Sequence, residues 1–179
     1  PGGPARGSLS ERFSALRRSV RQDPTARALV QRAQTFLELG HFDEALADLN
    51  RALEIEPLFP WALIVRSDAH YSLERYDQAF ADLERALAVE PDSPQALARR
   101  GELRRHLGQY GEALADLHRA LEVAPDDTWA LACRGDTYRE LGRFDEALQD
   151  FDRVLQVEPD HMWALVSRGL TYEDAGRYD

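Results

Sequence analysis

The sequence predicts an all-α fold, a right-handed superhelical solenoid of stacked helix-turn-helix hairpins. Three observations support it. The stretch LGRFDEALQDFDRVLQVEP, residues 141–159, has close copies as ERYDQAFADLERALAVEP and LGHFDEALADLNRALEIEP. The copies keep one spacing, because four prolines are each 34 residues apart: Pro57, Pro91, Pro125 and Pro159. Within each copy the apolar residues recur at three- and four-residue steps, the period of an α-helix. A fixed period of this length is typical of chains that stack one repeated unit.

Each repeat is expected to begin with a helix, called helix A, which covers residues 128–141 in the fourth repeat. Its sequence TWALACRGDTYREL has a helical spacing of apolar and small residues, at Trp129, Leu131, Gly135, Tyr138 and Leu141. Gly142 follows directly, and a glycine at this place commonly ends a helix.

A second helix, called helix B, is expected to follow over residues 144–158. The segment FDEALQDFDRVLQVE again spaces its apolar residues helically, at Phe144, Ala147, Leu148, Phe151, Leu155 and Val157, and Pro159 ends it. Gly135 and Ala147 are small enough to let the two helices approach closely, with Phe151 and Tyr138 filling the space beside them. Each repeat is therefore predicted to be a helical hairpin.

These residues resemble the tetratricopeptide repeat, a 34-residue helix-turn-helix unit with an aromatic residue and a Gly in helix A, an Ala in helix B and a closing Pro. The resemblance covers residues 26–179, as four full units (26–59, 60–93, 94–127 and 128–161) and a partial unit (162–179). Three positions depart from the pattern: the Gly of helix A is Ala33 and Ser67 in the first two units, and the Gly between the helices is Glu74 in the second.

Residues 1–25 form a separate basic segment upstream of the repeats. The first 32 residues hold seven Arg against two acidic residues, whereas the other 147 hold 15 Arg against 30 acidic residues. Residues 10–22 are expected to form a worn helix B or a cap, since Phe13, Leu16, Val20 and Pro24 follow its pattern. At the other end, the apolar residues of the last helix A indicate a piece of a longer protein, because a terminal cap needs a polar outer face.

Composition excludes several classes of function. The formal net charge is −10, and an acidic repeat region is a poor ligand for nucleic acid. No apolar run is long enough to span a membrane and no secretory signal is recognisable, so a cytoplasmic protein without membrane contact is expected. Cys133 is the only cysteine and the five histidines are scattered, which predicts neither a metal site nor a cofactor. No phosphate-binding loop or Gly-x-Ser-x-Gly motif is present, so the chain is not expected to be an enzyme.

The resemblance implies an extended concave groove lined by one face of the A helices, which binds rather than transforms its ligand. By alignment, the groove residues are Trp61, Ile64, Asp68, Tyr71, Glu102, Arg105, Trp129, Asp136, Arg139, Glu140 and Trp163. Two binding modes of the family use Lys and Asn side chains or a ladder of Asn. Neither is expected here, because the chain has no Lys and its only Asn is Asn50.

Asp68, Glu102 and Asp136 occupy one position of successive A helices, beside three tryptophans. Such an acidic column favours a partner that carries Arg or Lys, and aromatic anchors are typical of interfaces. Two simpler interpretations stay open. The acidic residues can serve only to solvate the helices, and each Trp, at the start of its helix, can pack over the preceding Pro turn.

An arginine recurs beside the small residue of every helix A, where a charge needs a partner. We expect Arg–Asp pairs between helices A and B, either within a repeat or with the preceding one, that set the register of the hairpins. The residues concerned are Arg66, Asp82, Arg100, Asp116, Arg134 and Asp150. The alternative is that each Asp pairs only with the Arg three residues further on, a weak surface contact.

The sequence thus favours a non-catalytic scaffold for protein–protein interaction, whose groove holds a basic peptide or domain. A second interpretation is a sensor or regulatory segment of a larger enzyme, such as a signalling ATPase, kinase or effector. A third is self-association, in which the basic segment Arg6 to Arg21 docks in the acidic groove of its own or another copy.

Overall fold

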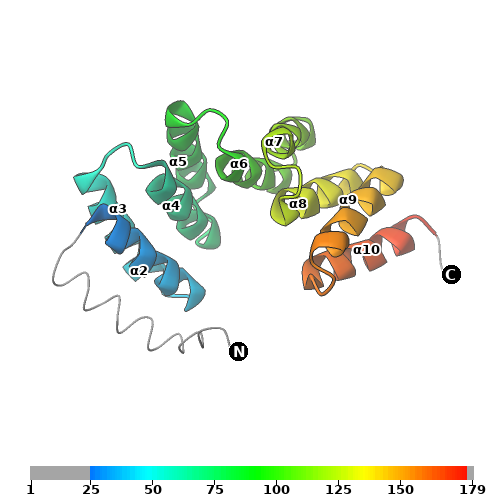
Figure 1. Ribbon diagram of the computed structural model, residues 1–179, viewed down its shortest axis with the longest axis horizontal. Helices are drawn as coiled ribbons and strands as arrows, with labels where there is room; N and C mark the ends of the chain where they lie inside the picture. Colours follow the sequence, from blue (N-terminus) through cyan, green and yellow to red (C-terminus); the bar gives the residue numbers. More distant parts are fainter. Residues whose placement is uncertain (1–24, 177–179) are drawn as a thin grey trace, which may run out of the picture. The chain divides into compact units, whose positions relative to one another are not determined.

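The computed structural model describes residues 25–176, and this part of the chain contains nine α-helices and no strand (Figure 1). The chain divides into two compact units, residues 1–90 and 91–179. The all-α class predicted from the sequence is confirmed. The worn helix expected at residues 10–22 and the basic segment that contains it lie outside the described residues.

Unit 1 contains two helical hairpins in its described part. The first joins α2 (Ala26–Glu38) to α3 (Phe42–Ile55), and the second joins α4 (Pro60–Ser72) to α5 (Tyr76–Val89). The helices of each hairpin pack on each other, and α4 also packs on both α2 and α3. Hairpins therefore stack on their sequence neighbours, as expected of a repeat architecture.

Unit 2 repeats this arrangement with five helices. The hairpins are α6 (Pro94–His106) with α7 (Tyr110–Val123), and α8 (Thr128–Glu140) with α9 (Phe144–Val157). They are followed by α10 (Met162–Asp174), which packs on α9 and on α8. Helices α2, α4, α6, α8 and α10 are the A helices of successive repeats, and the others are the B helices.

The close approach of the two helices in a hairpin depends on one small residue of helix A. A Cβ atom built on Gly101 would lie 2.7 Å from Leu117 Cγ, and one built on Gly135 would lie 2.7 Å from Phe151 Cε1. The first two repeats have Ala33 and Ser67 at this position, and both are buried. The Ser67 hydroxyl donates to the Ile64 carbonyl at 2.6 Å, so its polar group is satisfied inside the helix.

The turn between the helices of a hairpin needs one residue with left-handed backbone geometry. Gly40, Gly108 and Gly142 supply it with φ between 72° and 75°, and Glu74 takes the same place in the second hairpin with φ 57°. A side chain at this backbone geometry is strained, because its Cβ crowds the following carbonyl. The departure from the glycine pattern therefore leaves the turn unchanged and stores strain at Glu74.

Candidate binding surface

Each complete hairpin is crossed by one arginine–aspartate pair. Two arginine nitrogens, Nε and Nη2, donate to the two oxygens of an aspartate 16 residues further along. These contacts measure 2.6–2.7 Å for Arg66 with Asp82, Arg100 with Asp116 and Arg134 with Asp150, and Arg32 pairs with Asp48 in the same way. The structure thus pairs each arginine with the aspartate of its own repeat.

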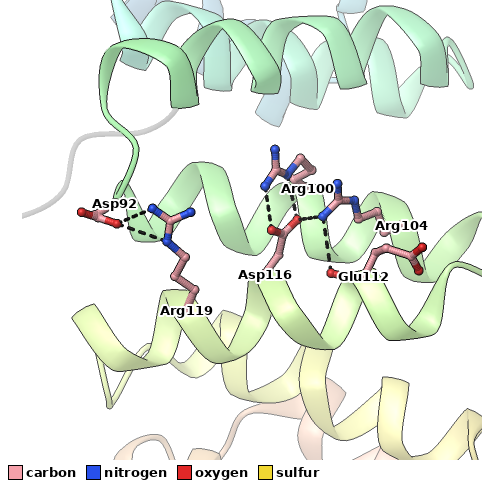
Figure 2. Close-up of polar contacts among 6 residues, drawn as sticks. All are labelled: Asp92, Arg100, Arg104, Glu112, Asp116 and Arg119. Atoms are coloured by element: carbon pink, nitrogen blue, oxygen red, sulfur yellow. Dashed lines mark hydrogen bonds and ion pairs between the residues drawn. The ribbon is translucent and has the colours of Figure 1, made fainter.

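The geometry of these pairs suits a structural role. All four aspartates are buried in the A–B interface, where a carboxylate needs a partner for both oxygens. Burial opposes the charge of Arg134, yet the contact with Asp150 raises its pKa above the ordinary value. In the third hairpin Arg104 adds a further contact, from Nη1 to Asp116 Oδ2 at 2.6 Å (Figure 2). The planar fork of Arg fixes how the helices face each other.

A second arginine column holds the turn between repeats. Arg85 Nη2 donates to the Pro57 carbonyl at 3.1 Å, and Arg153 Nη2 donates to the Pro125 carbonyl at 2.7 Å. Arg119 Nη2 instead donates to Asp92 Oδ1 at 2.6 Å, as Figure 2 shows. Sequence reasoning considered these arginines only as partners of the aspartate three residues earlier. Of the three, only Arg85 lies within ion-pair distance of that aspartate, with Asp82 at 3.6 Å. Each of these arginines follows a proline of the 34-residue column at a constant separation along the sequence. This constant separation was the feature of the sequence that could have predicted the contact with the turn.

The groove residues expected in unit 1 lie on α4 but differ in exposure. Trp61 is exposed at the start of the helix, whereas Ile64 is buried and belongs to the core. Tyr71 meets Tyr76 of α5 edge to face, with ring centroids 5.8 Å apart. Asp68 is half-buried. Of the four expected residues on α4, Trp61, Asp68 and Tyr71 therefore have surface to offer a ligand.

In unit 2 two expected tryptophans come together. The rings of Trp129 on α8 and Trp163 on α10 meet edge to face, with centroids 5.2 Å apart. The Arg99 guanidinium lies 4.1 Å from the centroid of Trp129, within the range of a cation–π contact. Trp163 Nε1 donates to Asp136 Oδ2 at 2.8 Å. We call Arg99, Glu102, Trp129, Asp136 and Trp163 the A face of unit 2. Sequence reasoning did not include Arg99 in the groove, although it lies one helical turn before the expected groove residue Glu102.

The other charged residues expected at the groove form ion pairs between neighbouring A helices. Arg105 Nη1 donates to Glu140 Oε1 at 2.6 Å, and Arg139 Nη1 donates to Asp174 Oδ2 at 2.9 Å. Both pairs join residues 35 positions apart, so they tie each A helix to the next. These ion pairs stabilise the stacking of α6, α8 and α10, so their charges are already engaged within the chain.

Asp136 is the least satisfied group of the A face of unit 2. Its side chain is buried, and its Oδ1 atom has no hydrogen-bond partner among the described residues. The Arg139 Nε atom lies 3.7 Å away, beyond hydrogen-bond distance, and is also without a partner there. A buried acceptor of this kind costs free energy until a donor reaches it.

The described residues contain no group of three side chains that could hold a metal ion, and none of their helices is long and apolar enough to cross a membrane. Cys133 is fully buried in α8, and burial raises the pKa of its thiol well above the ordinary value. A neutral, buried thiol is a weak nucleophile. What the described surfaces present to a ligand is side-chain contact and charge.

Comparison with known families assigns the repeats. Models of the tetratricopeptide repeat match residues 26–58, 68–135 and 104–169. The chain belongs to the tetratricopeptide repeat family. The resemblance inferred from the 34-residue pattern is thereby confirmed, and the pairs and turns described above are features of tetratricopeptide repeat (TPR) hairpins in this chain.

Solved structures of TPR proteins share the fold. A thermophilic TPR protein of Thermus thermophilus is 24% identical, with a TM-score of 0.83 over 92% of this chain and 91% of that chain. YrrB, a TPR protein with an unusual peptide-binding site, is 25% identical, with a TM-score of 0.65 over 93% of this chain and 87% of that chain. A chain of the Cut9–Hcn1 hetero-tetramer of the APC/C is 19% identical, with a TM-score of 0.88 over 93% and 34%. The search of curated protein sequences found no match.

Family and fold together support a scaffold for protein–protein interaction. TPR hairpins present helix faces to partner proteins, and the similar solved structures share the fold that presents them.

Proposed function

We propose that this TPR chain binds a partner peptide or domain through the exposed faces of its A helices, and that the partner carries Arg or Lys next to apolar residues. The observation that carries the proposal is the A face of unit 2, where Trp129 and Trp163 meet beside the carboxylate of Asp136. Clustered aromatic residues with a buried polar group are typical of interface hot spots.

Two features of this face favour a basic side chain. Arg99 already stacks on Trp129, so the chain itself shows that an indole of this face accepts a guanidinium. Asp136 Oδ1 lacks a donor among the described residues. A ligand ammonium or guanidinium beside Trp163 gains a cation–π contact and is attracted by the negative charge of Asp136.

The charge of unit 2 favours the same partner. Residues 91–179 contain 18 acidic side chains against 11 arginines, so the unit is negative overall. Negative potential speeds the encounter with a basic ligand and repels acidic ones. In unit 1, Trp61 and Asp68 offer the same pair of residue types on α4. We place this binding in the cytoplasm, a setting supported by the absence of a cysteine pair that could form a disulfide.

Peptide display against the full 179-residue chain tests the proposal. We expect selection to enrich peptides with Arg or Lys near an apolar residue. The double variant Glu102→Gln/Asp136→Asn should bind them at least about tenfold more weakly, which corresponds to about 1.4 kcal/mol. Trp163→Ala should weaken them similarly, because it removes an aromatic anchor.

A matched control removes the same number of charges elsewhere in unit 2. Glu112→Gln/Glu122→Gln on α7 changes exposed acidic residues and should leave the affinity within about twofold, since general attraction to a negative surface is weak at physiological salt. Enrichment of acidic peptides, or full affinity in a folded Glu102→Gln/Asp136→Asn variant, contradicts the proposal.

A further inference from the structure

Helix α6 differs from the other A helices at one position. The equivalent residues of α4, α8 and α10 are Val65, Cys133 and Ser167, which are uncharged and at most 5% exposed. The residue of α6 is Arg99, a half-buried arginine. A charge at a position that other repeats bury costs free energy unless it gains a partner. The packing pattern of the A helices therefore does not explain this arginine.

Arg99 has a partner on the next A helix of unit 2, α8. Its guanidinium carbon lies 4.1 Å from the centroid of the Trp129 ring, within the range of a cation–π contact. One repeat further along, Trp129 meets Trp163 of α10 edge to face, with ring centroids 5.2 Å apart. Helix α6 cannot offer Trp129 a ring in this way, because Gln95 holds the tryptophan position there. It offers a cation instead.

The contact between Arg99 and Trp129 is of a kind that a ligand can displace. Trp129 is 37% exposed and Arg99 is half-buried, so both side chains reach the solvent. A cation–π contact at an exposed site changes an equilibrium constant by only about two- to fivefold. A ligand that makes the same contact and adds others therefore has enough free energy to replace Arg99.

We propose that Arg99 is a built-in competitor for the A face of unit 2: its guanidinium occupies the indole of Trp129 that an arginine or lysine of the partner takes on binding. This inference rests on the proposed function, because it concerns the same surface and the same kind of ligand. A ligand that offers only a cation exchanges one cation–π contact for another and gains little. Arg99 thus favours partners that also place apolar residues on this face.

The probe is a fluorescein-labelled peptide, Leu-Arg-Leu-Arg-Leu-amide, in which each arginine lies between apolar residues. Fluorescence anisotropy follows its binding to the full 179-residue chain and to the variant Arg99→Gln. Glutamine is a suitable replacement, since Gln31 holds this position in α2. The variant should bind the peptide about two- to fivefold more tightly, because the ligand no longer has to displace a cation–π contact.

Arg119→Gln is the matched control for charge. Arg119 lies on α7 with its side chain 46% exposed, and the substitution removes the same positive charge from unit 2. It should change the affinity less than Arg99→Gln does, because exposed charges away from the ligand are screened by salt. Equal tightening in the two variants would overturn the inference, since the effect would then come from net charge.

The variant Glu102→Gln/Asp136→Asn separates this inference from the proposed function. If it binds the peptide more weakly while Arg99→Gln binds no more tightly than the wild type, the A face of unit 2 is the binding surface and only the competitor is refuted. If it keeps full affinity in a folded chain, the proposed function is contradicted. Absence of saturable binding to Arg99→Gln would also overturn the inference, because Trp129 is uncovered in that variant.

Nuclear magnetic resonance can observe the exchange itself. The Nε–Hε signal of Arg99, assigned by its absence from Arg99→Gln, should carry a ring-current shift that Trp129→Leu removes. Saturating the wild-type chain with the peptide should move this signal toward the position of a solvent-exposed arginine. A signal that keeps its shift in the complex would overturn the proposal, because Arg99 would then be a structural contact between α6 and α8.

Discussion

At the scale of single residues, Glu74 carries a backbone strain that its sister turns avoid. Its φ is 57°, in the left-handed region where a Cβ atom costs about 1–2 kcal/mol. Gly142 adopts the same geometry at the equivalent turn without that cost. The strain at Glu74 therefore lowers the stability of the second hairpin relative to the same hairpin with glycine at this turn.

Glu74→Gly should raise the free energy of unfolding by about 0.5–1 kcal/mol. The gain is smaller than the strain because glycine also increases the entropy of the unfolded chain. Urea denaturation followed by circular dichroism measures it. Gly142→Ala is the reverse control and should lower the free energy of unfolding by a similar amount. A Glu74→Gly variant less stable than the wild type would show that the turn is not strained.

Single residues also show how far sequence reasoning reaches at the candidate site. The 34-residue columns located the Arg–Asp positions, because an internal repeat gives the same neighbours to each copy. The columns left open whether the aspartate came from the same repeat, since that depends on how far the two helices are offset. They did not show that Ile64 is buried, although Val30, Ala98 and Ala132 at the same repeat position are buried too. They also could not show that Asp136 binds Trp163, because that contact depends on side chains that differ between copies.

At the scale of elements, the fold was more predictable than the surface. Helices α8 and α9 begin and end within one residue of their expected bounds, 128–141 and 144–158, since glycine and proline positions determine them locally. Side-chain pairing between A helices was not predicted. Arg105 with Glu140 and Arg139 with Asp174 join residues 35 positions apart, one more than the repeat length, so the repeat columns do not reveal them.

The hairpin of α4 and α5 has a histidine where the next hairpin has an arginine. Arg104 donates to Asp116, whereas His70 Nε2 lies 3.9 Å from Asp82 Oδ2 and His70 Nδ1 has no partner among the described residues. Burial lowers the pKa of His70 below its ordinary value, although Asp82 acts in the opposite direction and Arg66 and Arg75 add to the lowering. Protonation of His70 is thus harder in the folded hairpin than in the unfolded chain.

The stability of this hairpin should therefore fall in acid. The contribution of His70 is fully present above the pKa of an unfolded histidine, about 6.5, and is lost as the pH falls through the lower pKa of the folded state. We expect the free energy of unfolding to decrease between about pH 7.5 and 5.5. Urea titrations at several pH values should show a shallower decrease for His70→Phe.

The choice of phenylalanine follows the chain itself, because Phe36 holds this position in the first hairpin. Some decrease should persist in His70→Phe, since burial also lowers the pKa of His118. An unchanged pH dependence in a folded His70→Phe variant would mean that His70 titrates alike in both states.

At the scale of the whole molecule, the consequence of a repeat architecture is that stability is local. In each unit the helices pack on their own hairpin partner and on the neighbouring hairpin. The stability of such proteins is approximately a sum of repeat and neighbour contributions, so parts of the chain can open while the rest stays folded. The chain divides into two compact units, which makes the unit the natural size of such an opening.

Leu49 in α3 and Leu117 in α7 allow a matched test, because they hold the same repeat position in different units and both are fully buried. Replacing either with Ala should cost about 2–5 kcal/mol through lost burial and a cavity. Hydrogen exchange measured by mass spectrometry should then rise mainly across α2 to α5 in Leu49→Ala and mainly across α6 to α10 in Leu117→Ala. If each substitution raised exchange equally in both units, the chain would unfold as one cooperative body. The stability of each binding surface would then depend on every repeat, because a weakened hairpin in one unit would open the surfaces of the other.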